Sequence, residues 1–451
     1  MLRSLALLAG IATALAPMSA RAGPRVCASC VTSTMKRLTG PELAGRACGT
    51  DDDLATARYL ARRFKAYGVR GAAPGGGYLQ SVQFRVPAYA SPPVLQVGED
   101  RYVHGEGILV QTPMPDAAGP LVMLNKDGAP AEGAGRIVLF DGPYDPTTAA
   151  ALVKAGALAV IATPPDRLLK AWDQLALRPP GPVEVPGVEA PSPRPAGPPV
   201  IFARPETMAT LKLRAGTSAR IIATLGSPIL RTTYNVLAEI PGRSGQARRE
   251  VVLLSAHHDH LGVIDGQLYP GANDDASGTA AVLEFARIMK SGRGHKRTVQ
   301  FALFGCEEQG GHGSRYYLAH SPAPLVDIVA NLQFEMIGVP DPKDRKALML
   351  TGWDRSNLGP ALKARGASLG PDLYPQENFF MRSDNYRLAK KGVVAQTISA
   401  WPLPPTYHQP TDTLENVDLA FMIGVIQSLA DPIRWLLDSD FKPDWNPGMK
   451  P

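Results

Sequence analysis

Cysteine is scarce in this sequence, aromatic residues are few, and neither sign of charge dominates. The chain has 4 cysteines, 7% Phe, Trp and Tyr together, and 47 basic against 41 acidic residues in 451 positions. A formal charge of +6, without a basic stripe interleaved with aromatics, excludes a nucleic-acid-binding surface. The composition, 45% hydrophobic and 20% charged, is typical of a globular chain long enough for two domains.

The cysteines give little sign of a structural metal site. Cys27 and Cys30 form a lone CxxC pair, and because no second pair follows it, a structural zinc site is not expected. With Cys48 nearby, these residues permit one disulfide in an exported chain, but the sequence leaves the pairing open. Cys306 is expected at a buried strand end.

Long hydrophobic runs are absent as well. Residues 5–15 (LALLAGIATAL) are too short to span a bilayer. They follow Arg3 and precede the small-x-small triplet that ends at Ala22, a pattern typical of a secretory signal peptide over residues 1–22. We therefore expect a periplasmic or secreted protein, without membrane contact after cleavage because no other stretch approaches transmembrane length. The oligomeric state stays open.

The chain divides by its pattern into two regions. Residues 179–199 hold nine prolines in 21 positions, which predicts a surface loop. Around this loop, 135–162 reads as strand, helix and strand, and 219–225 as a further strand. The block 91–226 is thus expected to be a small α/β module inserted into a larger domain made of 31–90 and 227–441.

Strands and helices alternate in the larger domain. An amphipathic helix is expected over 51–67, and further helices over 277–290 and 417–437. The predicted strands cover 250–256, 299–305, 328–336, 347–352 and 393–400. This alternation predicts the α/β class, with a mostly parallel central sheet covered by helices on both faces.

Polar residues follow the predicted strands at the points where these end. His257 comes directly after EVVLLSA, Glu307 and Glu308 follow VQFALFG, and Glu335 closes IVANLQFE. His408 lies in the loop LPPTYHQPTD beyond the last strand. Functional groups of open α/β sheets gather beyond the carboxyl ends of the strands, so we expect these side chains to meet.

Mixed histidine and carboxylate ligands suit zinc. Two histidines and three acids exceed the needs of one catalytic zinc, and they fit two ions about 3.5–4 Å apart that share a carboxylate. Asp274, in the Gly/Pro-rich turn, is the candidate for sharing. Because side chains alternate near a strand end, His257 and Asp259 are expected to face the same way, which leaves His258 and His260 outside the ligand set. The remaining histidines have no partner pattern and are expected at the surface or in loops: His104, His295, His312 and His320.

Six motifs together resemble a known family. They are SAHHDHLG, PGANDDASG, FGCEEQGGHGS, NLQFEMIG, RSDNYRLAKKG and TYHQPTD. Their order and spacing are similar to those of the co-catalytic two-zinc aminopeptidases, whose family includes glutamate carboxypeptidases, glutaminyl cyclases and the transferrin receptor. The resemblance runs from about 231 to 437 and weakly over 35–90, and the inserted module resembles a protease-associated domain. It implies the zinc-exopeptidase fold, which is phosphorylase/hydrolase-like.

The resemblance also implies roles for individual residues. It implies five ligands of two zinc ions, with His257 and Glu335 on one, Glu308 and His408 on the other, and Asp274 bridging them. Glu307 would be the general base that takes a proton from a metal-bound water. Asp259 would orient the first histidine, and Tyr407 would donate to an oxyanion.

The sequence departs from the family at two positions. Glu335 stands where the aminopeptidases usually have Asp, and Asn385 ends an SDN triplet where the family has SDH. Arg382 opens the RSDN segment, and it can meet either a substrate carboxylate or an internal acid.

An exported two-zinc aminopeptidase acting on peptide substrates is therefore the predicted function, with three alternatives. The same site suits a carboxypeptidase or dipeptidase, which would need a fixed Arg or Lys for a free carboxylate. A glutaminyl cyclase would use one zinc. A non-catalytic binding protein is disfavoured because such a scaffold has no reason to keep buried carboxylates that repel one another.

Overall fold

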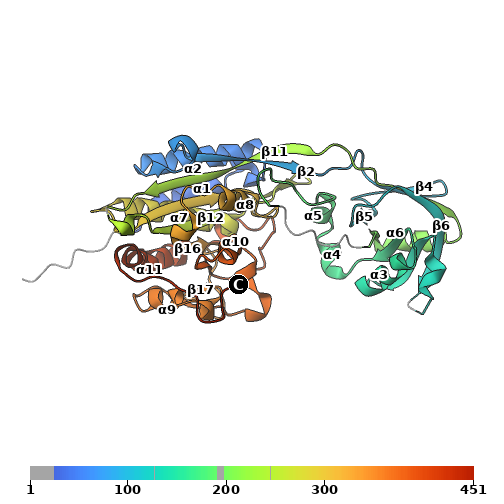
Figure 1. Cartoon of the computed structure of the whole chain (residues 1–451). Coiled ribbons are helices and arrows are strands. Elements are labelled where there is room, and N and C mark those ends of the chain that lie inside the picture. Colours follow the sequence, from blue (N-terminus) through green and yellow to red (C-terminus); the bar gives the residue numbers. More distant parts are fainter. Residues whose placement is uncertain (1–24, 126, 190–197, 244) are drawn as a thin grey trace, which may run out of the picture.

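The computed structural model describes residues 25–189 except 126, and 198–451 except 244. The predicted signal peptide, residues 1–22, lies outside the described residues. Two separate sheets stand at opposite ends of the molecule, with the larger one at the left of Figure 1. The larger sheet has nine strands in the order β1-β11-β15-β12-β16-β19-β17-β18, with β2 also paired to β11. Its short outer strands are β1 (Arg70–Gly71), β17 (Leu348–Leu350) and β18 (Leu369–Pro371).

Four neighbouring parallel strands form the centre of the larger sheet. They are β15 (Thr298–Phe304), β12 (Val251–His257), β16 (Ile328–Phe334) and β19 (Ala395–Ser399). Every residue of β12 and β15 is buried, which explains their continuous apolar sequence, since helices cover both faces. The outer pairs β11–β15 and β17–β19 are antiparallel. The predicted α/β class is confirmed, with a parallel centre and antiparallel flanks.

Two sets of helices cover the two faces of this sheet. The larger core is built on α1 (Ala28–Leu38), α2 (Asp51–Ala66), α7 (Gly278–Lys290), α9 (Leu358–Lys363) and α11 (Leu419–Asp438). The opposite core is built on α8 (His312–Ala319) and α10 (Asn385–Lys390). Helix α2 begins with three aspartates after the N-cap Thr50, so the negative side chains lie where the helix dipole favours them.

Helix α11 corrects the expectation that no second stretch reaches transmembrane length. It is the one helix among the described residues that is long and apolar enough to cross a membrane by length and composition alone. Its side chains Val425, Ile426, Leu429 and Ile433 are buried in the larger core. We therefore assign α11 to the core of the domain.

The chain segment that forms the second sheet is inserted, in sequence, between two paired strands of the first sheet. Strands β2 (Leu79–Val86) and β11 (Ile229–Ile240) form an antiparallel ribbon whose partners Val86 and Ile229 stand side by side. The chain leaves the larger domain after β2 and returns with β11 (Figure 1). Between them lie eight strands: β3 (Val94–Val97), β4 (Asp100–Val103), β5 (Ile108–Val110), β6 (Ala117–Asn125), β7 (Ile137–Pro143), β8 (Ala159–Thr163), β9 (Val200–Ala203) and β10 (Ser218–Ile222).

This inserted module touches the larger domain through helix α5 (Trp172–Ala176) and the first part of its proline-rich loop. This helix brings the Gln174 amide to 3.5 Å from the carbonyl oxygen of His408. Further along, Glu184 pairs with Arg85 of β2, and Val185 packs in a cluster with both Cys48 and Cys306. The resemblance of the module to a protease-associated domain stays a prediction.

Two disulfides are present where the sequence permitted one. Cys27 and Cys30 are bonded to each other, and Cys48 is bonded to Cys306 across 258 positions. The second bond is buried and ties the segment before α2 to the turn that carries Glu307 and Glu308. The expected pairing among the three N-terminal cysteines alone was therefore incomplete.

Candidate active site

The parallel centre of the sheet brings the predicted groups to one edge. Strand β12 ends at His257, β16 ends one residue before Glu335, and β15 ends three residues before Glu307. Because β12 pairs in parallel with both neighbours, these three ends point the same way. The loop after β19 brings Tyr407 and His408 to the same place, since both line a cavity with Glu307 and Glu308.

Asp274 lies between the two predicted histidine ligands. Its Oδ1 is 3.2 Å from His257 Nε2, and its Oδ2 is 3.2 Å from His408 Nε2. Glu308 Oε2 is 3.0 Å from the same nitrogen of His408. Each carboxylate oxygen of Asp274 thus faces a different histidine, which is the arrangement a carboxylate shared by two metal ions requires.

The donor set fits metal ions. Among the described residues, the buried Nε2 atoms of His257 and His408 find no partner with hydrogen-bond geometry, although carboxylate oxygens lie 3.0–3.2 Å away. Burial raises the pKa of Glu335 to about 7. It raises the pKa of Glu307 well above the ordinary value too, and the nearby carboxylates of Asp384 and Glu335 add to this against the effect of His257. Neighbouring carboxylates repel one another when they are ionised, and a bound cation relieves this repulsion. Histidine nitrogen and carboxylate oxygen donors of this kind suit zinc.

Asp259 holds the turn that carries both glutamates. Its Oδ1 accepts from the backbone N–H of Glu307 at 2.9 Å, and its Oδ2 accepts from that of Glu308 at 3.3 Å. Its carboxylate is 3.7 Å from His257 Nδ1, whereas its backbone carbonyl oxygen is 3.2 Å away and in hydrogen-bond geometry. Asp259 is buried beside His257 as expected, but its nearest carboxylate contacts are to the glutamate turn.

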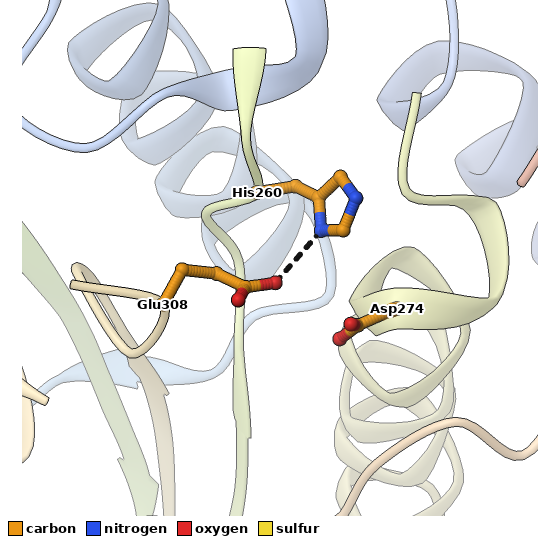
Figure 2. A group of neighbouring side chains, drawn as sticks. All are labelled: His260, Asp274 and Glu308. Carbon is orange, nitrogen blue, oxygen red and sulfur yellow. Dashed lines mark hydrogen bonds and ion pairs between the residues drawn. The ribbon is translucent and has the colours of Figure 1, made fainter. Parts of the chain in front are cut away.

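His260 belongs to the site, contrary to the expectation from strand alternation. Its Nδ1 is 2.8 Å from Glu308 Oε1, so Glu308 stands between His260 and His408. Figure 2 shows His260, Asp274 and Glu308 converging, and their ligand atoms lie within 4.8 Å of one another. Alternation failed here because β12 ends at His257, three residues before His260, and the period of two holds only within a strand.

The two departures from the family pattern have distinct structural outcomes. Glu335 lines a cavity with Asp274, Glu307 and Glu308, and its Oε2 accepts a hydrogen bond from the Ser383 hydroxyl. Asn385 is fully buried and turned into the scaffold. Its amide donates to the carbonyl oxygens of Phe380 and Ala395, and its Oδ1 accepts from Thr397. Asn385 therefore acts as a structural residue of α10.

Tyr407 lies over the second histidine. Its ring stacks on that of His408 with centroids 3.9 Å apart, and it lines both cavities of the site. Burial and the carboxylates of Asp274 and Glu308 raise the pKa of the phenol far above its ordinary value. The hydroxyl consequently stays protonated and remains a hydrogen-bond donor.

Buried groups from outside the strand ends support the site. Arg46 is fully buried, and its guanidinium donates to the carbonyl oxygens of His258, Pro270 and Gly271 as well as Leu38. It thereby joins the segment that holds His257 to the turn that holds Asp274. Asp412 accepts from the backbone N–H of Asp274 at 3.0 Å. A basic residue in the LAGRACGT segment gave no sign of this role, because its partners around the site are backbone atoms more than 200 positions away.

The other histidines were predicted at the surface or in loops; His295 does lie in a loop, although it is buried, whereas His312 lies buried in a helix. His295 is buried, with Nδ1 3.0 Å from Asp438 and Nε2 3.1 Å from the Met289 carbonyl oxygen. His312 is buried at the start of α8. His104 is partly buried in the inserted module, and His320 is exposed.

A family model identifies the larger domain. Residues 235–430 match the model of peptidase family M28. This region is therefore similar to peptidase family M28. The matched residues include every predicted ligand and every central strand of the sheet.

Relatives that match part of the chain are described as aminopeptidases. The chain is 28% identical over 217 residues to aminopeptidase YwaD of Bacillus subtilis, covering 46% of this chain and 43% of that protein. It is 29% identical over 222 residues to the probable lipoprotein aminopeptidase LpqL of Mycobacterium tuberculosis, covering 41% of each. The chain thus spans less than half the length of these curated relatives.

The fold extends beyond the matched region. The structure of BSAP, a zinc aminopeptidase from Bacillus subtilis, superposes with a TM-score of 0.63 at 20% identity, covering 92% of this chain and 96% of that one. Such coverage includes the inserted module as well as the larger domain.

Proposed function

We propose that this M28 protein is a zinc-dependent aminopeptidase that removes N-terminal residues from peptides. The observation that carries the proposal is Asp274, whose two carboxylate oxygens face His257 and His408, with Glu308 on the same histidine. The names of the relatives and of the structural neighbour, all aminopeptidases, support the same activity.

Two zinc ions fit the donors. We assign His257 and Glu335 to one ion, Glu308 and His408 to the other, and Asp274 to both. His260, in contact with Glu308, orients that carboxylate. When bound, the ions supply a water of lowered pKa and polarise the scissile carbonyl.

The protein's own groups then handle the proton and the charge. Glu307 lines both cavities beside the ligands, and it accepts the proton of the attacking water and passes it to the leaving amine. Asp259 fixes the backbone on which Glu307 stands. The protonated hydroxyl of Tyr407 donates to the oxygen that gains negative charge.

We propose peptides as the partners and an exported location for the chain. The sequence pattern of residues 1–22 and the lipoprotein description of one relative support export. We further propose that the inserted module is a wall that restricts substrate size, since α5 reaches the loop that carries His408.

Substitution of His104 tests whether the module holds chemistry. Its Nδ1 accepts from the Val110 N–H at 3.0 Å, and its Nε2 lies 3.1 Å from the Ala176 carbonyl oxygen. We expect His104→Ala to lower the free energy of unfolding by about 1–3 kcal/mol, because two hydrogen bonds are lost. Turnover of a small aminoacyl anilide should stay largely unchanged. A loss as severe as that of His257→Ala would contradict a non-catalytic module.

The direction of cleavage is tested with one peptide in free, N-acetylated and C-amidated forms. An aminopeptidase must bind the free α-ammonium, and acids dominate the site, so acetylation is expected to abolish cleavage while the amidated peptide is still cleaved. Mass spectrometry of the products identifies the bond. Cleavage of the acetylated peptide with loss of activity on amidation would instead establish a carboxypeptidase.

A further inference from the structure

Two cavities meet at the reacting groups. The first, of about 60 Å³, is lined by Asp274 and Glu335 together with apolar side chains from Met336, Met349 and Phe379. The second, of about 380 Å³, is an open groove lined by Met381, Tyr386 and the cations Arg382, Arg387 and Lys390. Both are bordered by Glu307, Glu308, Arg382, Ser383 and Tyr407. The scissile bond therefore belongs at this shared border.

The charges order the two cavities along a peptide. Asp274 and Glu335 line the small cavity and do not line the groove, so the N-terminal residue with its ammonium belongs in the small cavity. The leaving part of the peptide then enters the groove. The three cations of the groove come from α10 and the turn before it. Acids at one end and cations at the other complement a short peptide with both termini free.

Two of these cations are not committed to internal acids. Arg387 is held by Asp384 at 3.6 Å and by the Gly310 carbonyl oxygen at 2.9 Å. Arg382, 43% exposed, has its nearest carboxylate in the equally exposed Glu377 at 4.0 Å. Within the part of the chain that the structure describes, no ion pair involves Lys390, whose ammonium lies 5.2 Å from the Tyr386 ring. Arg382 and Lys390 therefore remain free to bind an anion.

We propose that this groove is a carboxylate subsite, in which Arg382 and Lys390 bind the free C-terminal carboxylate of di- and tripeptide substrates. The proposal rests on the proposed aminopeptidase function and narrows its substrates to short peptides. Arg382 borders both cavities and so stands closest to the scissile bond, where a dipeptide ends. Lys390 lines only the groove, away from the shared border, and we assign it to the terminus of a tripeptide.

The test compares peptides that differ only in their charge. Leu-Ala and Leu-Ala-Ala are assayed with their C-terminal amides and with leucine anilide, on the zinc-loaded enzyme. We expect kcat/KM to be about 5–20-fold higher for each free acid than for its amide, the range of a charge-assisted hydrogen bond at a half-exposed site. The preference for free acids should appear as a lower KM and should become smaller as the ionic strength rises. Leu-Glu-amide shows whether an acidic side chain serves as well as the terminus.

Substitutions assign the preference to the two cations. Arg382→Gln is expected to bring the ratio of kcat/KM for the free acid to kcat/KM for the amide close to one with the dipeptide. Lys390→Gln is expected to do the same with the tripeptide. Lys391→Gln is the matched control, since this neighbouring exposed lysine does not line the groove, and both ratios should stay at the wild-type values. Equal rates for acids and amides in the wild type, with leucine anilide cleaved, would overturn the subsite alone. No cleavage of any aminoacyl substrate would overturn the aminopeptidase function and the subsite together.

Discussion

Replacing Glu307 by glutamine is expected to lower hydrolysis by about 10²–10⁴ or more, the range of general-base catalysis, while the fold and both zinc ions are retained. Glutamine has nearly the same shape but cannot accept a proton. The backbone N–H of residue 307 still donates to Asp259, so the turn keeps its position. The measurements are kcat on an aminoacyl anilide, zinc content by elemental analysis, and the thermal unfolding midpoint.

Glu308→Gln provides the contrast at the adjacent position. Glu308 lies between His260 and His408, so its substitution is expected to lower zinc content as well as activity. A base and a ligand are thereby distinguished. Glu307→Gln should lose activity but keep its zinc, whereas Glu308→Gln should lose both activity and zinc. If Glu307→Gln keeps near-native turnover, the base is another residue.

Exhaustive chelation is expected to abolish activity, and added zinc should restore it, because the buried acids and histidines perform no hydrolysis without the ions. Elemental analysis of the active protein should give two zinc ions per chain. Because the ions bind only the folded site, their removal should also lower the unfolding midpoint.

Alternative outcomes of the chelation experiment have distinct meanings. Activity that survives confirmed metal loss would rule out the two-metal mechanism. One zinc per chain together with pyroglutamate formation would establish a glutaminyl cyclase. Stable zinc binding without turnover of any peptide would favour a binding protein on the same scaffold.

Most of the predicted ligands could be placed from the sequence because the central strands are parallel. Parallel strands end at the same edge, so the polar residues just beyond EVVLLSA, VQFALFG and IVANLQF had to approach one another. Side-chain alternation, by contrast, failed to place His260, because this residue lies three positions beyond the end of β12, where the strand period of two no longer applies.

The sequence by itself determined the α/β class, the central strands and the residues at their ends, since these follow from local periodicity and chain order. Only the tertiary structure decided which distant segments meet. The bond between Cys48 and Cys306 spans 258 positions, and the carbonyl oxygens that Arg46 binds around the site come from residues beyond 257. The groove cations likewise face the leaving side of a peptide only because α10 packs beside the turn of Glu307 and Glu308. Local pattern carries no record of such packing, because it depends on contacts between parts of the chain that are far apart in sequence.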